Sequence, residues 1–341
     1  MTGQGDLELF LDETPGETRG VVVRGGRPIH LFITRDDDAP QLRLGARVLG
    51  RVAETAPGLR GAFIDVGGET HAFLHLARNE SVTQGERLQV VVTAEPRRGK
   101  GAAVRRLGPG QGEVRLLESA PSIADRLRTI APGVPIVGGL PALDAADEAQ
   151  EEALSDHFTF PAQGLDLAIQ RTRALVAVDV DHAPEPGRDP SRSRAAANAH
   201  ALRQAARLIG LKGWGGLVVI DVAGDGRDGE ALLKTARAAF AHEPQAVFGP
   251  VSRFGLIQLS TPWKRTPIEE VLAPGVRTRA QALVRQLRRH ILSDTTSARV
   301  VAYSAPDEAV VAAPLAARLG PRVLVRADAA LAPGRSRIEE A

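Results

Sequence analysis

Two aspartates, Asp179 and Asp221, each end a short apolar run and are well placed to do chemistry together. Asp179 closes LVAVD and Asp221 closes GLVVID, and the separation of 221 − 179 = 42 residues suits one crossover helix with its loops. Because ligands collect where parallel strands end, we expect the two carboxylates to be neighbours. Neighbouring carboxylates repel one another unless a proton or cation lies between them, and Mg²⁺ prefers carboxylate ligands. The pair is therefore a candidate magnesium site.

A third carboxylate, Asp181, follows Asp179 by two residues and so lies on the same side of the strand. It could orient the first carboxylate or act as a further ligand. An aspartate at a strand end can also simply cap the next helix or turn, and the spacing alone does not decide between these roles. The spacing alone therefore gives a candidate metal site and not a reaction.

A second candidate surface lies earlier in the chain, where two short runs alternate apolar and polar residues. The runs from Gly61 to Val66 and from His71 to Leu76 place Phe63 and Phe73 on a polar outer face. A basic stretch follows, formed by Arg97, Arg98, Lys100, Arg105 and Arg106. Exposed aromatic rings beside basic residues stack unpaired bases, each worth about 1–3 kcal/mol. The alternative is that a neighbouring domain covers both rings.

The elements that must position these residues change in character along the chain. Residues 44–107 show short alternating runs between turns, which predicts a small β-barrel. Further on, a strand at 175–179, an amphipathic helix at 193–209 closed by Gly210, and a strand at 216–221 predict a βαβ unit with a parallel pair. Two early strand-like runs, 7–11 and 20–23, need a partner elsewhere in the chain.

Composition places the chain among ordinary globular proteins. Its 341 residues are 43% hydrophobic and 25% charged, and no apolar run approaches the roughly 20 residues that span a bilayer. The N-terminus lacks the pattern of an export signal and there is no cysteine, so disulfides and thiolate metal sites are not expected. The net charge is only +2, but almost all basic residues are arginine, which favours phosphate contacts. We expect a soluble, cytoplasmic protein without membrane partners.

The segment GRVAETAPGLRGAFIDVGGETHAFLHL, residues 50–76, resembles the S1 RNA-binding domain of the ribonuclease E/G family. EPRRGKGAAV, residues 95–104, is similar to the basic loop at the end of that domain. The resemblance implies that Phe63 and Phe73 stack bases and that Lys100, with Arg98, contacts phosphates.

The second half resembles the same family in three ordered strands. These are LVAVDVD at 175–181, GGLVVID at 215–221 and VSRFGLIQLS at 251–260, which are similar to its DNase I-like catalytic subdomain. The resemblance implies that Asp179 and Asp221 bind magnesium. In the mechanism that we expect, Asp181 orients Asp179, and Ser252 and Arg253 are candidate substrate contacts. An arginine beside an apolar strand is as often structural.

The resemblance implies a mixed α/β fold in four parts. An S1-type OB β-barrel (41–108) is inserted in an RNase H-like subdomain (1–40 and 121–172). A DNase I-like α/β catalytic subdomain (173–272) and a small α/β C-terminal unit (273–341) follow.

The chain also departs from the family pattern. Only residues 108–120 stand where the family has a subdomain that senses a 5′-monophosphate, and Gln245 replaces an arginine with the same purpose. Asp181 stands where the family has asparagine, which adds negative charge beside the candidate metal. The two cysteines of the family's zinc link are absent around residues 273–276, so no zinc is expected.

The sequence therefore predicts a Mg²⁺-dependent endoribonuclease, with Mn²⁺ as an alternative ion, that cleaves single-stranded RNA. The resemblance also implies a homodimer. A second hypothesis is an RNA-binding protein or assembly factor that kept the nuclease scaffold with little or no turnover, motivated by the missing sensor and by Asp181. A third is a metal-dependent phosphatase or nucleotide hydrolase, motivated by the acidic pair alone, which leaves the S1-like barrel unexplained.

Overall fold

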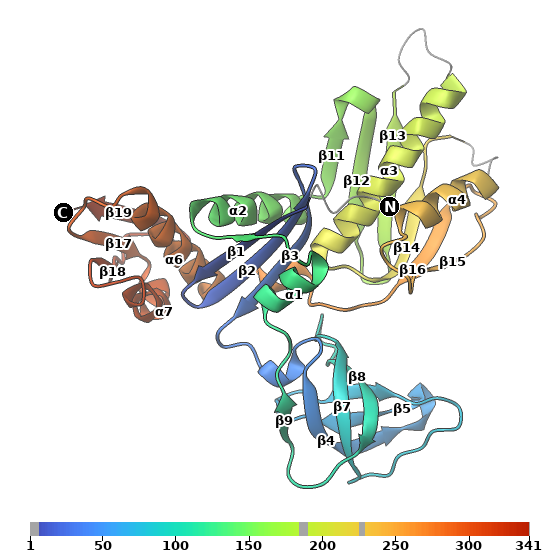
Figure 1. The fold of residues 1–341 in the computed structure, drawn as a ribbon, viewed down its shortest axis with the longest axis horizontal. Coiled ribbons are helices and arrows are strands. Elements are labelled where there is room, and N and C mark those ends of the chain that lie inside the picture. Colours follow the sequence, from blue (N-terminus) through green and yellow to red (C-terminus); the bar gives the residue numbers. More distant parts are fainter. Residues whose placement is uncertain (1–6, 184–189, 225–228, 341) are drawn as a thin grey trace. The chain divides into compact units, whose positions relative to one another are not determined.

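A computed structural model describes residues 7–183, 190–224 and 229–340 and shows a mixed α/β protein (Figure 1). The chain forms two compact units, one made of Met1–Gln150 with Ile268–Ala341 and the other of Glu151–Pro267. The predicted mixed α/β class is confirmed, whereas the division into four subdomains stays a prediction. Within the described ranges, no helix combines the length and apolar character needed to cross a bilayer.

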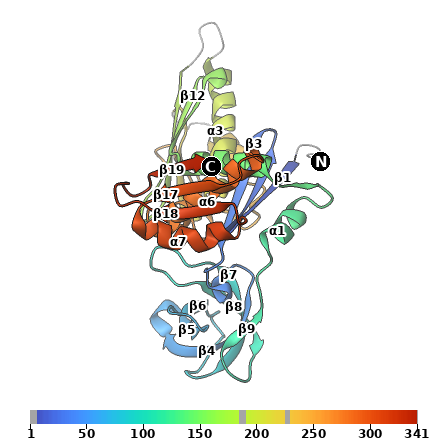
Figure 2. The same cartoon turned by 90° about the vertical axis from the view of Figure 1, so that its left-hand side faces the viewer.

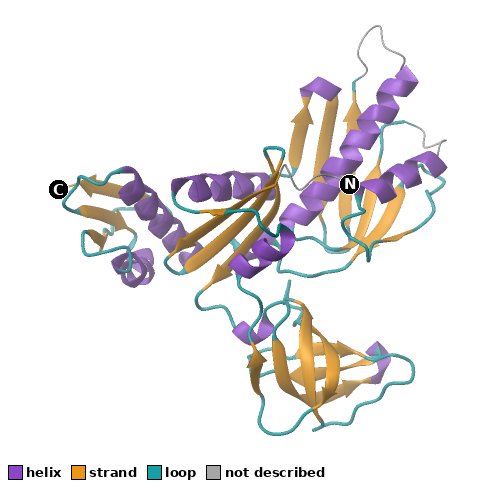
Figure 3. Cartoon of the chain, viewed as in Figure 1, coloured by secondary structure: helices purple, strands orange, loops and turns teal. Residues whose placement is uncertain are grey.

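A five-stranded barrel of the OB type occupies the region where the sequence predicts one. Its strands are β4 (Arg47–Ala56), β5 (Gly61–Asp65), β6 (Ala72–His75), β7 (Arg87–Ala94) and β8 (Ala103–Pro109). They pair in the order β5-β6-β8-β7-β4 and close through β4 and β5, while β9 (Arg115–Glu118) adds to the outer side of β4. Inward side chains such as Val52, Ile64 and Leu74 form its core, because alternate residues of each strand face inward. Figure 3 shows a barrel built almost wholly of strand.

The two early strand-like runs find their partners in a second sheet. It contains β1 (Leu7–Thr14), β2 (Glu17–Arg24), β3 (Arg27–Arg35) and β10 (Ile136–Val137) in the order β10-β1-β2-β3. β10 pairs in parallel with β1, so the predicted later partner exists. Helix α1 (Ile123–Ile130) begins at Ser122, whose hydroxyl accepts from the Asp125 amide, and packs Leu127 into the sheet's core. Helix α2 (Leu140–Leu154) follows.

A three-stranded sheet with two helices lies near the end of the chain (Figure 2). Its strands, in the order β18-β17-β19, are β17 (Val300–Ser304), β18 (Val323–Ala327) and β19 (Ser336–Glu340). Helices α6 (Val276–Ser293) and α7 (Pro306–Ala317) pack Leu283, Leu287 and Ala312 against it. Helix α5 (Ile268–Val271) precedes α6.

Buried ion pairs connect α6 to the first strands. Asp12, with no exposed side-chain surface, accepts from Arg285 and lies 2.7 Å from an Arg288 nitrogen. Glu17 is also fully buried and pairs with Arg19 at 2.6 Å and Arg35 at 2.7 Å. Burial alone would raise the pKa of Glu17, but the two arginines outweigh it and lower that pKa below its ordinary value. The carboxylate therefore stays ionised inside the protein.

The second unit is a six-stranded mixed sheet with helices on one face. The strands, in spatial order, are β11 (His157–Phe160), β12 (Leu165–Arg171), β13 (Val176–His182), β14 (Gly216–Asp221), β16 (Ile257–Thr261) and β15 (Val247–Phe248). β13 and β14 are parallel and joined through α3, so the predicted βαβ unit is confirmed. Helix α3 (Pro190–Lys212) packs beside β12, β13 and α4 (Gly229–Ala239).

Helix α3 is longer than the sequence predicts. It passes through Gly210 and ends at Lys212, because Gly213, with φ +70°, adopts the left-handed conformation that stops a helix. Lys212 has only 1% of its surface exposed, and its ammonium donates to the carbonyl oxygens of Ala153 (2.8 Å) and Ser155. The end of α3 is thereby fixed to the segment that leads into β11.

Candidate metal centre and nucleic-acid interface

Asp179 and Asp221 stand directly opposite one another on the adjacent parallel strands β13 and β14. The register runs Val176 to Val218 through Asp179 to Asp221, so the predicted neighbourhood of the two aspartates is confirmed. Both residues are exposed. In β13 the aspartates alternate with valines along the strand. Val176, Val178 and Val180 face the helices and are buried, so the residues between them lie on the opposite face.

The opposite face of the sheet is solvent-exposed and acidic near the strand ends. Asp181 is exposed on this face and pairs in register with Asp166 of β12. Nε2 of His157 lies 2.6 Å from a carboxylate oxygen of Asp166. Four carboxylates and one imidazole therefore lie on four neighbouring strands. They are Asp221 on β14, Asp179 and Asp181 on β13, Asp166 on β12 and His157 on β11.

The sequence does not single out Asp166 or His157 as site residues. The alternation of Leu165, Leu167 and Ile169, which are all buried, was the available signal, because it places Asp166 on the outer face. The sequence does not indicate that β12 pairs with β13, because an antiparallel pair of strands has no sequence motif that identifies it.

The loop that contains Arg253 lies at the same edge of this sheet. β16 runs antiparallel to β14 and begins at Ile257 opposite Ile220, so the preceding loop emerges beside the end of β14. The hydroxyl of Ser252 accepts from the amides of Phe254 (3.2 Å) and Leu256 (3.1 Å) and holds the loop in a tight turn.

This turn presents two side chains to solvent. Arg253 is exposed, and Phe254 is 88% exposed, the highest value among the large exposed apolar residues of the described chain. The exposure of Phe254 was not predicted, because the sequence places this residue within a strand at 251–260, whereas β16 begins only at Ile257. The edge with the carboxylates therefore also has a cation and an aromatic ring.

The aromatic face of the barrel has the predicted form. The rings of Phe63 and Phe73 meet edge-on with centroids 5.3 Å apart, and Phe73 meets His75 at 4.7 Å. Both phenylalanines are partly exposed, while Ile64 and Leu74, on alternate positions, are buried. A side chain at Gly61 would meet the Phe73 ring at 2.3 Å, so glycine is required for the ring to lie across the strand.

The basic loop lies next to this face, and its two predicted contact residues differ. The Phe73 amide donates to the Ala102 carbonyl at 2.7 Å, which places the turn with Lys100 beside the aromatic strand. Lys100 is exposed. Arg98 has a left-handed backbone, φ +38°, and lies 3.6 Å from Glu270, to which its amide also donates. Both cations are exposed, and Arg98 differs in being paired with a carboxylate.

The residues at the sheet edge fit a hard divalent cation. Two exposed carboxylates at opposing register positions bring like charges together, and oxygen ligands of this kind are those that Mg²⁺ and Mn²⁺ accept. Asp179 and Asp221 are the pair that would hold the ion, and Asp181 lies two residues away on the same face.

The fold and this edge define an α/β domain with a candidate site for a divalent cation. Residues 140–264 match the sequence profile of the Ribonuclease E/G family. The matched segment includes both aspartates and nearly all of the second unit, so the resemblance to this family is confirmed over that part of the chain.

Curated relatives give the same result over this part of the chain. Ribonuclease G from Escherichia coli strain K12 and Ribonuclease G from Salmonella typhimurium are each 32% identical over 116 residues. Ribonuclease G from Haemophilus influenzae is 32% identical over 117 residues. Each alignment spans 28% of this chain but only 23% of the relative, so the likeness covers less than a quarter of those proteins.

Proposed function

We propose that this protein is a metal-dependent endoribonuclease that cleaves single-stranded RNA with Mg²⁺ held by Asp179 and Asp221. The observation that supports the proposal best is the opposing register of these two exposed aspartates within the segment that matches the Ribonuclease E/G family. When bound, the metal supplies Lewis-acid chemistry, lowering the pKa of water and neutralising charge on the phosphate.

The neighbouring residues have separate tasks in this proposal. Asp181 orients Asp179 and adds negative charge that strengthens cation binding. Arg253 contacts an RNA phosphate, and Phe254 stacks on an unpaired base next to it, because the Ser252 turn holds both at the edge where the aspartates lie.

The barrel holds the RNA through a second set of contacts. Phe63 and Phe73 offer two edge-on rings on one face, and Lys100, with Arg98, offers cations beside them. Because phosphate contacts release counterions, RNA affinity should fall steeply as salt rises.

A circular single-stranded RNA tests the endonuclease directly, because it has no end from which an exonuclease could start. We expect the circular RNA to be cut into linear and then shorter products with Mg²⁺, and to stay intact with EDTA. Cleavage of linear RNA from one end, with the circle intact, would contradict an endonuclease.

A second candidate function is RNA binding with little or no turnover. The observation that favours it is the register of Asp181 with Asp166, because added carboxylates repel the phosphate that must approach. Tight binding of RNA without cleavage, with either 5′-hydroxyl or 5′-monophosphate substrates, would support this function over the first.

A further inference from the structure

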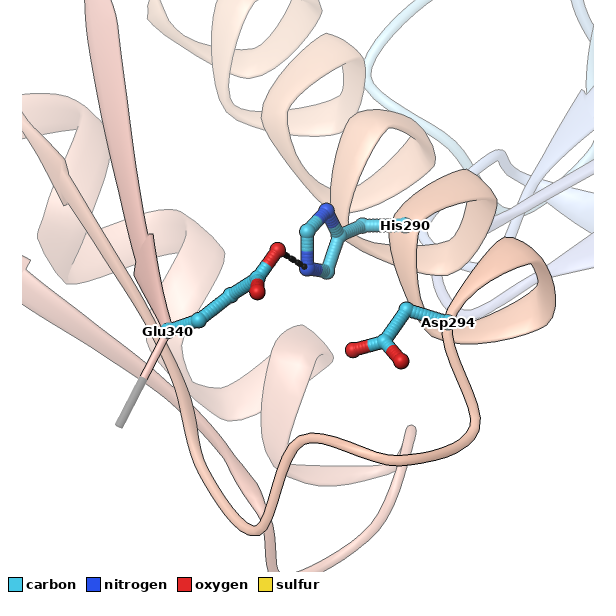
Figure 4. Close-up of side chains that lie close together, drawn as sticks. All are labelled: His290, Asp294 and Glu340. Atoms are coloured by element: carbon cyan, nitrogen blue, oxygen red, sulfur yellow. Dashed lines mark ion pairs between the residues drawn. The ribbon is translucent and has the colours of Figure 1, made fainter.

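A second group of metal-type ligands lies at the end of α6, in the other compact unit from Asp179 and Asp221. His290 and Asp294 are one helical turn apart, and the Asp294 amide donates to the His290 carbonyl at 2.8 Å. Glu340 comes from β19, paired in register with Val300 of β17. Figure 4 shows the three side chains turned toward one common space, and their ligand atoms all lie within 4.8 Å of one another.

The contact between His290 and Glu340 has the spacing of two ligands on one ion. Nε2 of His290 lies 3.1 Å from Oε1 of Glu340, yet this buried nitrogen has no hydrogen-bond partner among the described residues. The two atoms are therefore close without the alignment of a hydrogen bond. Adjacent ligands about 2.1 Å from a metal are separated by roughly 3.0–3.4 Å, which matches this spacing.

The charges at this cluster also favour a cation. Within the described part of the chain, Asp294 forms no ion pair and Glu340 forms one, with His290. Both carboxylates lie at the C-terminal end of α6, where the helix dipole is negative. Arg322 lies nearby, but the hydrogen bonds of its guanidinium go to the carbonyl oxygens of Ile291, Asp294 and Ser297. It orders the turn rather than neutralising the carboxylates.

Hydrogen bonds from the neighbouring residues Thr296 and Ser297 hold two of the three ligands, Asp294 and Glu340. The Thr296 amide and hydroxyl donate to one oxygen of Asp294, at 2.8 and 2.6 Å, and the Ser297 amide donates to the other. The Ser297 hydroxyl also donates to Glu340 at 3.3 Å. Such an outer shell is typical of metal ligands.

We propose that His290, Asp294 and Glu340 form a site for one divalent transition-metal ion. One imidazole and two carboxylates suit ions such as Mn²⁺, Co²⁺ and Zn²⁺ better than Mg²⁺. The ion would tie β19 to the last turn of α6 and stabilise the C-terminal sheet. The site departs from the expectation that the protein holds no zinc, and it does not depend on the nuclease proposal.

The test uses the full chain with Asp179→Asn and Asp221→Asn, so that the other candidate metal site is removed. Co²⁺ is titrated into metal-free protein while visible absorption is followed, and Zn²⁺ is then added during thermal unfolding. His290→Gln and Glu340→Gln remove one ligand each. Glu339→Gln is the matched control, because Glu339 is the neighbouring residue of β19 and pairs with Arg337.

The proposal expects uptake of one Co²⁺ with a d–d absorption band, displacement by Zn²⁺, and a higher unfolding temperature with Zn²⁺. Affinity should fall at least tenfold in His290→Gln and in Glu340→Gln and stay unchanged in Glu339→Gln. Absence of binding, or equal binding by all variants, would mean that His290 and Glu340 form an ordinary ion pair and would overturn the proposal. RNA cleavage by the unmutated chain is scored separately, so the two proposals fail independently.

Discussion

Asp179 of β13 stands opposite Asp221 of β14 in parallel register, and both side chains are exposed on the face of the sheet away from α3. Two carboxylates in this position repel one another until a cation joins them. Buried valines pack both strands against the helices, and the strand register holds the two positions opposite one another. The proposed nuclease depends on this relationship.

Replacing Asp181 by asparagine should raise the Mg²⁺ concentration that cleavage requires. The change removes one negative charge beside the metal pair, so the Mg²⁺ concentration for half-maximal cleavage should rise about two- to tenfold. A Mg²⁺ titration of cleavage rate measures this shift. Glu151→Gln, an exposed acid in the same unit but off this face, is the control and should leave the titration unchanged.

Replacing Phe73 by alanine should reduce affinity for single-stranded RNA about 5- to 150-fold, the equivalent of losing one stacked base at about 1–3 kcal/mol. Fluorescence anisotropy with a labelled RNA measures the affinity. Leu107→Ala, a partly exposed apolar residue of the same barrel, is the control. Equal affinity of Phe73→Ala and the control would show that the aromatic face does not bind RNA.

Replacing Phe254 by alanine should raise the KM for RNA, because the ring stacks on the substrate in the proposed complex. Phe254→Trp should retain binding, and its fluorescence should be quenched as RNA is added. Val310→Ala removes a similarly exposed apolar side chain on α7 and should have no effect. An unchanged KM in Phe254→Ala would remove this residue from the site.

Replacing Asp12 by alanine should lower the free energy of unfolding by about 3–5 kcal/mol, because Arg285 would be left buried without this partner. Urea denaturation measures the change. Glu8→Ala, on the same strand but exposed, should change it by less than about 0.5 kcal/mol. A loss of similar size in both variants would contradict the ion-pair account.

Glu17 should contribute to an acid dependence of stability. Its folded pKa is lowered, so its contribution is present above its ordinary value of 4.5 and is lost as pH falls below that toward the folded pKa. The difference in stability between the protein and Glu17→Gln should therefore shrink below about pH 4.5. Denaturation curves at several pH values measure it, with Glu13→Gln, an exposed acid of β1, as the control.

The sequence was most informative where hydrophobic period and motif agreed. The alternation at Ile64 and Leu74 correctly placed Phe63 and Phe73 outside the barrel, and the apolar runs before Asp179 and Asp221 correctly predicted adjacent parallel strands. In each of these cases a short local pattern decides which face a residue occupies.

Contacts between distant segments could not be predicted in the same way. The pairing of Asp166 with Asp181 depends on which strand lies beside β13, and the approach of Glu340 to His290 depends on β19 joining β17. The Arg98 contact with Glu270 likewise joins residues far apart in the chain. No local period encodes such pairings, because tertiary packing selects them.

The most direct test compares the protein with its Asp179→Asn, Asp221→Asn double variant on a labelled, A/U-rich single-stranded RNA, with Mg²⁺ or with EDTA. Asp166→Asn, a carboxylate of the same face outside the metal pair, shows whether any loss is specific to the pair. The account predicts cleavage that requires Mg²⁺, is retained by Asp166→Asn, and is at least 10³-fold slower in the double variant, roughly a 4 kcal/mol rise in barrier. Undiminished cleavage by a double variant of unchanged stability would contradict the account.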